Sequence, residues 1–284
     1  MTLVVSELRR YGVVMVADCA VTTRPAQSIV LPDGPPVTEY ARTGAQKVFP
    51  VDQIQAGVSV WGRGSLDDGT PMDLWLESLL RSGVREEDTL KTLGEMLAEE
   101  ANAKIAPPQD DSEKYGFHVG GFIDTDDGRL PALYHVHCGH DNGAPHELRL
   151  YQDCPDHGFC GNRVYDDMSQ YAEALAGQRG PEAYWHQLRN GTYTEFAYII
   201  KYLTGSLTEL REREGFSAPE PDDLHNRARY LKLVVETVCD IYAMSTQRRH
   251  IAKPVSLLTI SSEGIEDFVP TSLSTQLQPR GRSI

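Results

Sequence analysis

Two apolar runs stand at the start of the chain and are separated by a short polar turn. The first, residues 3–5, follows Thr2 directly, and the second, residues 12–17, ends at Asp18. Valine dominates both runs, which favours two β-strands joined as a hairpin. The first residues of most domains are loosely held, so a strand that begins at the third residue predicts a terminus built into a sheet.

The remaining apolar patterns predict further strands and several amphipathic helices. Strands are expected over residues 47–51, 56–61, 117–123, 132–137 and 255–260. Helices are expected over residues 72–80, 90–101, 166–177, 181–213 and 231–242, with Asp88 as the N-cap of the second. Runs of strands and runs of helices, without strict alternation, favour a layered α+β fold with antiparallel sheets. We expect one domain over residues 1–284, with a helical insertion at about 163–222 and a loose C-terminal tail at about 270–284.

The charge balance narrows the range of partners. Twenty-seven basic and forty-one acidic residues give a net charge of −14, which argues against nucleic acid or an anionic membrane surface. No apolar run reaches membrane-spanning length, and Glu7, Arg9 and Arg10 interrupt the N-terminal apolar stretches, unlike in a signal peptide. The five cysteines are irregularly spaced, which favours reduced thiols and a cytoplasmic location.

Four residues of the first sixty-two have a spacing of particular interest. Thr2 follows Met1, Asp18 opens the sequence DCAVT, Lys47 lies in QKVF, and Gly62 ends SVWG. This set resembles the proteasome β-subunit and HslV-type peptidases, in which a mature N-terminal threonine, an aspartate, a lysine and a glycine form the site. On these motifs the chain is identified as a divergent, bacterial-type member of that family.

The resemblance implies the four-layer αββα fold of N-terminal nucleophile hydrolases, made of two antiparallel sheets between helical layers. It also implies a threonine peptidase without cofactor or metal, which self-associates into stacked rings and acts on peptides or unfolded proteins. An ATP-dependent unfoldase that feeds the rings is a further partner in such systems. Cys160 is the nearest counterpart of the family's serine in a Gly-Ser-Gly turn, and residues 245–250 show no Asp-x-x-Ser motif.

The chemistry of these residue types supports the same site. A threonine hydroxyl is a poor nucleophile without a nearby base, and a free α-amino group, which titrates near about pH 7.7–8.0, can serve as that base. The Lys47 ammonium would lower the pKa of both groups of Thr2, and Asp18 would hold the lysine in place. The N–H group of Gly62 would stabilise the oxyanion, and losing one such donor costs about 2.7–4 kcal/mol.

Substrate binding is expected next to these residues. An extended peptide could add as a strand along residues 20–22, which include Val21 and Thr22, and along the Gly62 segment. Val21 and Val60 would then line an apolar pocket. The mechanism requires removal of Met1, because the nitrogen of Thr2 is otherwise a non-basic amide.

Several alternatives remain open at this stage. The same fold could serve an amidase acting on a small molecule, or a non-catalytic ring-forming subunit that retains Met1. A structural metal is a third alternative, because histidines 118, 135, 137, 140, 146 and 157 and cysteines 138, 154 and 160 lie within one stretch. The spacings CxxC and HxxxH are absent from that stretch, so we favour ordinary strand-end residues and no metal. Cys19 is disfavoured as a thiol nucleophile, since the pattern suggests no histidine near it.

Overall fold

The structure is a computed structural model of the whole chain. It describes residues 2–9, 11–22, 40–108, 114–125, 128–138, 148–152, 186–191, 223–244 and 251–271, together with the single residues 199, 202, 206 and 209.

The first sheet contains the N-terminal hairpin at its centre. Its five antiparallel strands follow the order β10 (His186–Gly191), β1 (Leu3–Arg9), β2 (Gly12–Ala17), β11 (Ser256–Ser261) and β12 (Gly264–Val269). The hairpin predicted at the start of the chain is therefore confirmed. Both strands have a neighbour on their outer side, so the N-terminal residues are fixed within a sheet and not at its edge.

The second sheet is a meander in which each strand pairs with the next one along the chain. Its order is β5 (Val48–Val51), β6 (Ala56–Trp61), β7 (Gly116–Thr125), β8 (Gly128–Cys138) and β9 (Leu148–Gln152), all antiparallel. A 3₁₀ turn, Asp52–Ile54, joins β5 to β6. Two short strands, β3 (Val21–Thr22) and β4 (Tyr40–Arg42), form a separate two-stranded ribbon.

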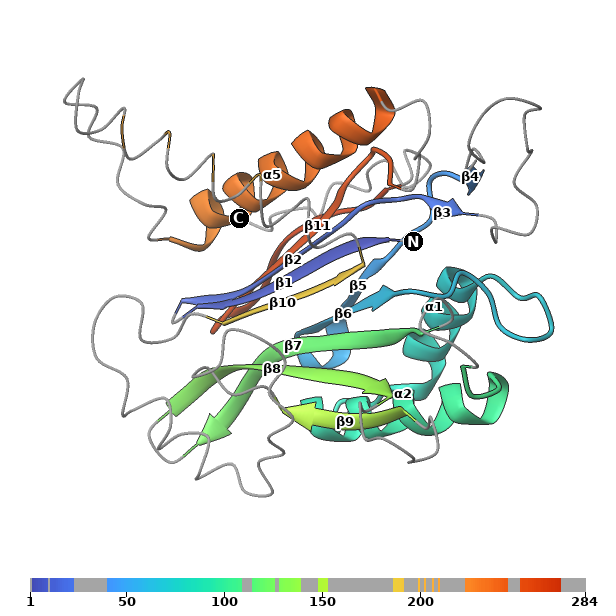
Figure 1. Ribbon diagram of the computed structural model, residues 1–284. Helices are drawn as coiled ribbons and strands as arrows, with labels where there is room; N and C mark the ends of the chain where they lie inside the picture. Colours follow the sequence, from blue (N-terminus) through green and yellow to red (C-terminus); the bar gives the residue numbers. More distant parts are fainter. Residues whose placement is uncertain are drawn as a thin grey trace, which may run out of the picture.

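Helices cover the outer faces of the two stacked sheets (Figure 1). The helix α5 (Leu224–Met244) packs on β2 and β11, whereas α1 (Met72–Gly83) and α2 (Leu90–Lys104) pack on the second sheet. The predicted four-layer αββα sandwich of two antiparallel sheets is therefore confirmed.

Close packing between the sheets depends on glycine at the crossing points. A Cβ atom added to Gly120 of β7 would lie 2.7 Å from the Cε atom of Met15 on β2. One added to Gly57 of β6 would lie 2.3 Å from the Cδ2 atom of Leu258 on β11. These distances are below any normal contact, so side chains from one sheet occupy the space that a larger residue would need.

The outer face of the first sheet forms a second apolar core. Leu3 and Val5 of β1 pack there against Leu231, Val234 and Val238 of α5, and all five are fully buried. Apolar residues recur along α5 at the spacing of one helix face, as the sequence predicted. This core holds the first residues of the chain in place.

Three details differ from the sequence-based expectation. Residues 186–191 were expected to be helical but form β10, which pairs with β1 from Leu3↔Gly191 to Leu8↔His186. The strands β4, β9 and β12 were not expected. The N-cap of α2 is Thr89, which exchanges hydrogen bonds with Thr92, and not Asp88. The single-domain assignment over residues 1–284 remains a prediction. So do the helical insertion and the C-terminal tail, most of whose residues lie outside the described ones.

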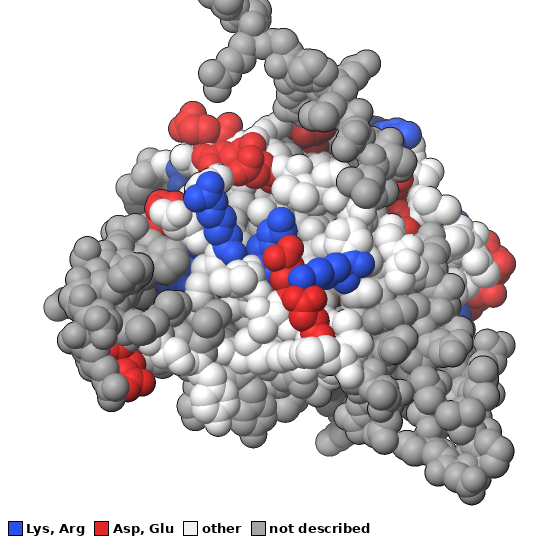
Figure 2. All heavy atoms as spheres, turned by 90° about the horizontal axis from the view of Figure 1, so that it is seen from above, with Lys and Arg blue, Asp and Glu red and all other residues white. Residues whose placement is uncertain are grey.

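The surface of the molecule on the α5 side carries charges of both signs. Figure 2 shows Lys and Arg side chains beside Asp and Glu side chains among uncharged residues. Ion pairs on this side include Lys232–Glu236, at 3.7 Å, and Lys253–Asp240, at 2.7 Å. Within the described part of the chain, no helix combines the length and apolarity needed to cross a membrane.

Candidate active site

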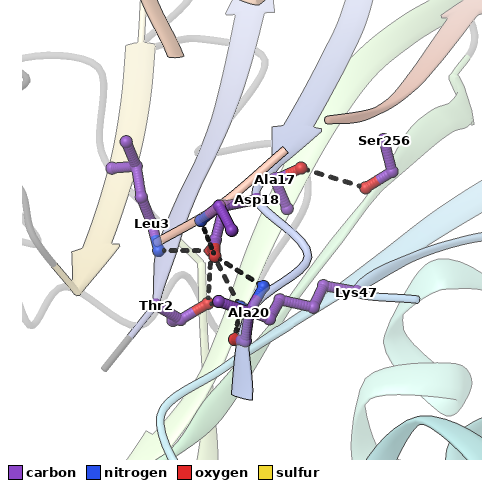
Figure 3. A network of polar contacts seen from close by, with 8 residues as sticks. Thr2, Leu3, Ala17, Asp18, Ala20, Lys47 and Ser256 are labelled. Atoms are coloured by element: carbon purple, nitrogen blue, oxygen red, sulfur yellow. Dashed lines mark hydrogen bonds and ion pairs between the residues drawn. The ribbon is translucent and has the colours of Figure 1, made fainter. Parts of the chain in front are cut away.

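Thr2 and Asp18 lie side by side at the same end of the N-terminal hairpin. Val4 pairs with Ala17, and the N–H group of Asp18 donates to the carbonyl oxygen of Leu3 at 3.1 Å. The Thr2 hydroxyl donates to Asp18 Oδ1 at 2.9 Å, and the backbone N–H of Leu3 donates to the same oxygen at 2.8 Å (Figure 3). A spacing of sixteen residues therefore becomes direct contact through strand pairing.

Lys47 reaches this pair from the other sheet. It directly precedes β5, and its Nζ atom donates to Asp18 Oδ1 at 2.8 Å, to the carbonyl oxygen of Ala20 at 2.5 Å and to Thr2 Oγ1 (Figure 3). An ammonium group has three donors, and these acceptors match all three. The Thr2 hydroxyl thus donates to the carboxylate while accepting from the ammonium group. Thr2 is 2% exposed, Asp18 0% and Lys47 6%, so water screens these contacts weakly.

The Asp18 carboxylate is fixed by the backbone around it. Its Oδ2 atom accepts from the N–H of Ala20 at 2.8 Å and from the N–H of Ala252 at 3.4 Å. The turn after Asp18 is held in addition by a hydrogen bond from Cys19 N to Ala252 O, at 3.0 Å. This turn aims the carbonyl of Ala20 at Lys47, so the aspartate orients the lysine both directly and through its own turn.

Gly62 occupies a position that only glycine fits. Its φ is +89°, and an added Cβ atom would lie 2.1 Å from the carbonyl oxygen of Lys114. Gly62 follows β6, in which Val60 N donates to the carbonyl oxygen of Lys47 at 2.9 Å. Gly62 therefore lies two residues beyond the backbone partner of Lys47, at the end of the sheet where the site forms.

The residues expected to bind substrate occupy two environments. Val21, on β3, is partly exposed, and an added Cβ atom on Gly64 would lie 2.5 Å from its Cγ1 atom. Thr22 pairs with Tyr40, and β4 is the only described strand that pairs with β3. Val60 is 5% exposed and belongs to the apolar core. The assignment of these three residues to a substrate pocket stays a prediction, and Cys160 and residues 245–250 lie outside the described residues.

Cys19 is adjacent to the site but is buried, and burial raises the pKa of its thiol above the ordinary value. A raised pKa reduces the thiolate fraction at neutral pH, which is the opposite of what a thiol nucleophile needs. The structure therefore gives no support to Cys19 as a rival nucleophile.

Three of the histidines considered as metal ligands do lie together. The ring centroids of His135 and His137 are 4.1 Å apart, and those of His118 and His135 are 4.9 Å apart. Trp61 donates to His135 Nε2 at 3.2 Å, and His118 contacts Ser6 Oγ at 2.8 Å. Among the described residues, no group of three or more His, Cys, Asp or Glu side chains is arranged to hold a metal ion. Of the other histidines and cysteines in that stretch, Cys138 ends β8, and the rest lie outside the described residues.

The sequence could not indicate the backbone groups that complete the site. Leu3 N, Ala20 N and Ala252 N donate to Asp18, and Ala20 O accepts from Lys47. Every residue has such groups, so no residue type marks them. Ala252 also joins the site from 234 residues away, through the segment before β11.

Comparison with known proteins gives structural similarity only. No family model matches the chain, and no curated protein matches it. Among solved structures, a Gly-1 mutant of Anbu from Hyphomicrobium sp. strain MC1 is 11% identical, with 97% of this chain and 89% of that one covered and a TM-score of 0.48. Anbu from Yersinia bercovieri, described as an ancestral β-subunit, is also 11% identical, with 96% and 88% covered and a TM-score of 0.46.

These results correct the family assignment made from the motifs. The assignment to the proteasome β-subunit and HslV-like family is wrong: the two similar structures named above are of Anbu proteins, a distinct family that has a proteasome-like fold. At this identity the similarity concerns the fold alone. A function must therefore be argued from the side chains of this chain.

Proposed function

We propose that this protein hydrolyses peptide bonds with Thr2 as its nucleophile, once Met1 and anything else that precedes Thr2 has been removed. The observation that carries the proposal is the contact between the Lys47 ammonium group and Thr2 Oγ1. A lysine buried against a threonine hydroxyl, and held there by a fully buried aspartate, favours the alkoxide that attacks a carbonyl carbon.

The reaction proceeds in two halves. Thr2 Oγ attacks the carbonyl carbon of the substrate, and its proton passes to the free α-amino group of Thr2. This amine can accept the proton because an α-amino group titrates at about pH 7.7–8.0 and is therefore partly neutral at pH 7. The tetrahedral intermediate expels the amine, which takes that proton, and leaves an ester on Thr2. Water then attacks the ester and gives a proton to the α-amino group. That proton passes to Thr2 Oγ as the ester bond breaks, which releases the carboxylic acid and restores the hydroxyl group of Thr2.

The other residues act on charge and position. Lys47 stabilises negative charge on Thr2 Oγ during attack, and Asp18 keeps the ammonium group aimed at that oxygen. The N–H group of Gly62 is the proposed donor to the oxyanion of the substrate. Val21, Thr22 and Val60 are the proposed binding residues, with the peptide lying in extended form beside β3.

The test begins with the intact mass of the purified protein. We expect a chain that starts at Thr2, and we expect it to hydrolyse an unstructured, fluorescently labelled polypeptide. Thr2→Ala should abolish this activity, whereas Thr2→Ser, which keeps a hydroxyl group, should retain part of it. Thr237→Ala, on the exposed side of α5, is the matched control and should be fully active.

Two results would contradict the proposal. Undiminished hydrolysis by Thr2→Ala would mean that another group is the nucleophile. An inactive protein that retains Met1 would favour a non-catalytic, ring-forming subunit.

The same assay separates the remaining alternative. Thr2-dependent hydrolysis of small amides, without cleavage of polypeptides, would assign the protein as an amidase for small molecules. Native mass spectrometry tests the self-association into rings expected from the sequence. A homo-oligomer is the predicted result, and a monomer would contradict it.

A further inference from the structure

The residue that precedes Lys47 forms a clamp across it. The Nε2 atom of Gln46 donates to the carbonyl oxygen of Val48, so the Gln46 side chain spans the lysine backbone. Its Oε1 atom accepts two hydrogen bonds from Thr271, one from the backbone N–H and one from the hydroxyl, each at 2.9 Å. Both polar atoms of the Gln46 amide group therefore form hydrogen bonds. The nitrogen binds Val48, on the far side of Lys47, and the oxygen binds Thr271.

Thr271 comes from the opposite sheet. It follows β12, which pairs with β11 in the sheet that contains β1 and β2. It is 3% exposed, and its hydroxyl also lies 3.4 Å from the carbonyl oxygen of Gly44. The clamp therefore links the segment that delivers Lys47 to the sheet that carries Thr2 and Asp18.

A second link fixes the same segment from the Asp18 side. Ala45 N donates to the carbonyl oxygen of Cys19 at 3.0 Å, one residue after Asp18. Residues 44–46 are thus held between the turn after Asp18 and Thr271. Lys47 directly follows this segment, which is held at both places. Four rotatable side-chain bonds then separate the Cα atom of Lys47 from its Nζ atom.

We infer that Gln46 and Thr271 are positioning residues, which set where the Lys47 ammonium group lies relative to Thr2. The inference rests on the proposed function. Neither residue hydrogen-bonds Thr2 or Asp18 in the described structure, so each acts through Lys47. A lysine side chain has considerable rotamer freedom, and a displacement of about 1 Å at a reacting group can cost about 100-fold in rate.

The test compares full-length variants that remove the clamp and leave the site residues in place. Gln46→Met keeps the length of the side chain and removes both polar groups. Thr271→Val keeps the shape of the side chain and the backbone N–H group but removes the hydroxyl group, whereas Thr271→Ser retains the hydroxyl group. Gln53→Met, at an exposed position of the 3₁₀ turn, is the matched control.

We expect Gln46→Met to lower kcat by about 10–100-fold with little change in KM, because the lysine acts on the nucleophile and not on substrate binding. Thr271→Val should lower kcat by less, and Thr271→Ser and Gln53→Met should match the wild type. The double variant Gln46→Met, Thr271→Val should be no slower than Gln46→Met alone, since both changes break one clamp.

Thermal unfolding of each variant distinguishes a role in positioning Lys47 from a role in stability alone. A lower unfolding temperature with unchanged kcat in Gln46→Met would overturn the inference, because the clamp would then serve stability alone. A rate loss in Thr271→Ser equal to that in Thr271→Val would also overturn it. Thr2→Ala is run alongside: if it is active, the proposed function fails, whereas an inactive Thr2→Ala with a fully active Gln46→Met contradicts the clamp alone.

Discussion

Replacing Lys47 by methionine removes the ammonium group while keeping most of the apolar length of the side chain. The variant loses three hydrogen bonds, to Thr2 Oγ1, Asp18 Oδ1 and the carbonyl oxygen of Ala20. Asp18 is left as a buried carboxylate, but it keeps the Thr2 hydroxyl and the N–H groups of Leu3 and Ala20 as donors. The variant should therefore fold.

The expected loss of stability is set by the broken ion pair. Removing one partner of a buried pair costs about 3–5 kcal/mol, and the donors that Asp18 retains favour the lower end. A loss of about 3 kcal/mol lowers the unfolding temperature by about 6–12 °C in a domain of this size class. The activity should fall much further, by about 10²–10³-fold in kcat, because Thr2 Oγ loses the positive charge that stabilises it during attack.

The assay follows polypeptide hydrolysis at a temperature well below the unfolding transition of the variant. Lys91→Met is the matched control, because Lys91 lies on the exposed face of α2, 3.9 Å from Glu95. We expect that control to match the wild type in both kcat and unfolding temperature. A folded Lys47→Met protein with wild-type kcat would refute the reasoning and would mean that the lysine has a structural role only.

Two further predictions concern Gly62 and Glu7. Gly62→Ala should be inactive and clearly destabilised, because its Cβ atom would meet the carbonyl oxygen of Lys114. Gly69→Ala is the control, since Gly69 has a φ of +87° and open space around it, and its free energy of unfolding should fall by only about 1–2 kcal/mol. Burial raises the pKa of Glu7, but hydrogen bonds and charge from Arg227, with a smaller effect of Arg9, outweigh burial and hold the pKa below the ordinary 4.5. Its contribution to stability is therefore full above pH 4.5 and is lost as the pH falls through the lowered value, which chemical unfolding from pH 7 to pH 3 can measure. Glu7→Gln should cost about 3–5 kcal/mol at pH 7 and lose much of the acid dependence; an unchanged pH profile in that variant would contradict this assignment.

The sequence predicted those parts of the fold that depend on local pattern. Valine-rich runs indicated β1 and β2, and the spacing of apolar residues indicated α1, α2 and α5. The strand β10, with the sequence HQLRNG, has no such pattern. It is a strand because it pairs with β1, and that pairing joins residues from 178 positions apart (Leu8↔His186) to 188 positions apart (Leu3↔Gly191).

The candidate site likewise has parts that the sequence could predict and parts that it could not. Thr2 and Asp18 could be related from the sequence because they end two strands of one hairpin, and Lys47 could be placed by the motif around it. The clamp between Gln46 and Thr271 could not be predicted, because it joins ordinary polar residues 225 positions apart. The backbone groups around Asp18 were equally invisible, since only the folded chain shows which carbonyl or N–H group faces the site.

The most direct measurement of the central claim is the site of acylation by an activated ester. The protein is incubated with p-nitrophenyl acetate, and tandem mass spectrometry locates the acetyl group. If Thr2 is the nucleophile activated by Lys47, the acetyl group is found on Thr2 in the wild type and is largely absent from Lys47→Met. Acetylation of Thr2 at the same rate in both proteins, or rapid acetylation at another residue only, would contradict the account.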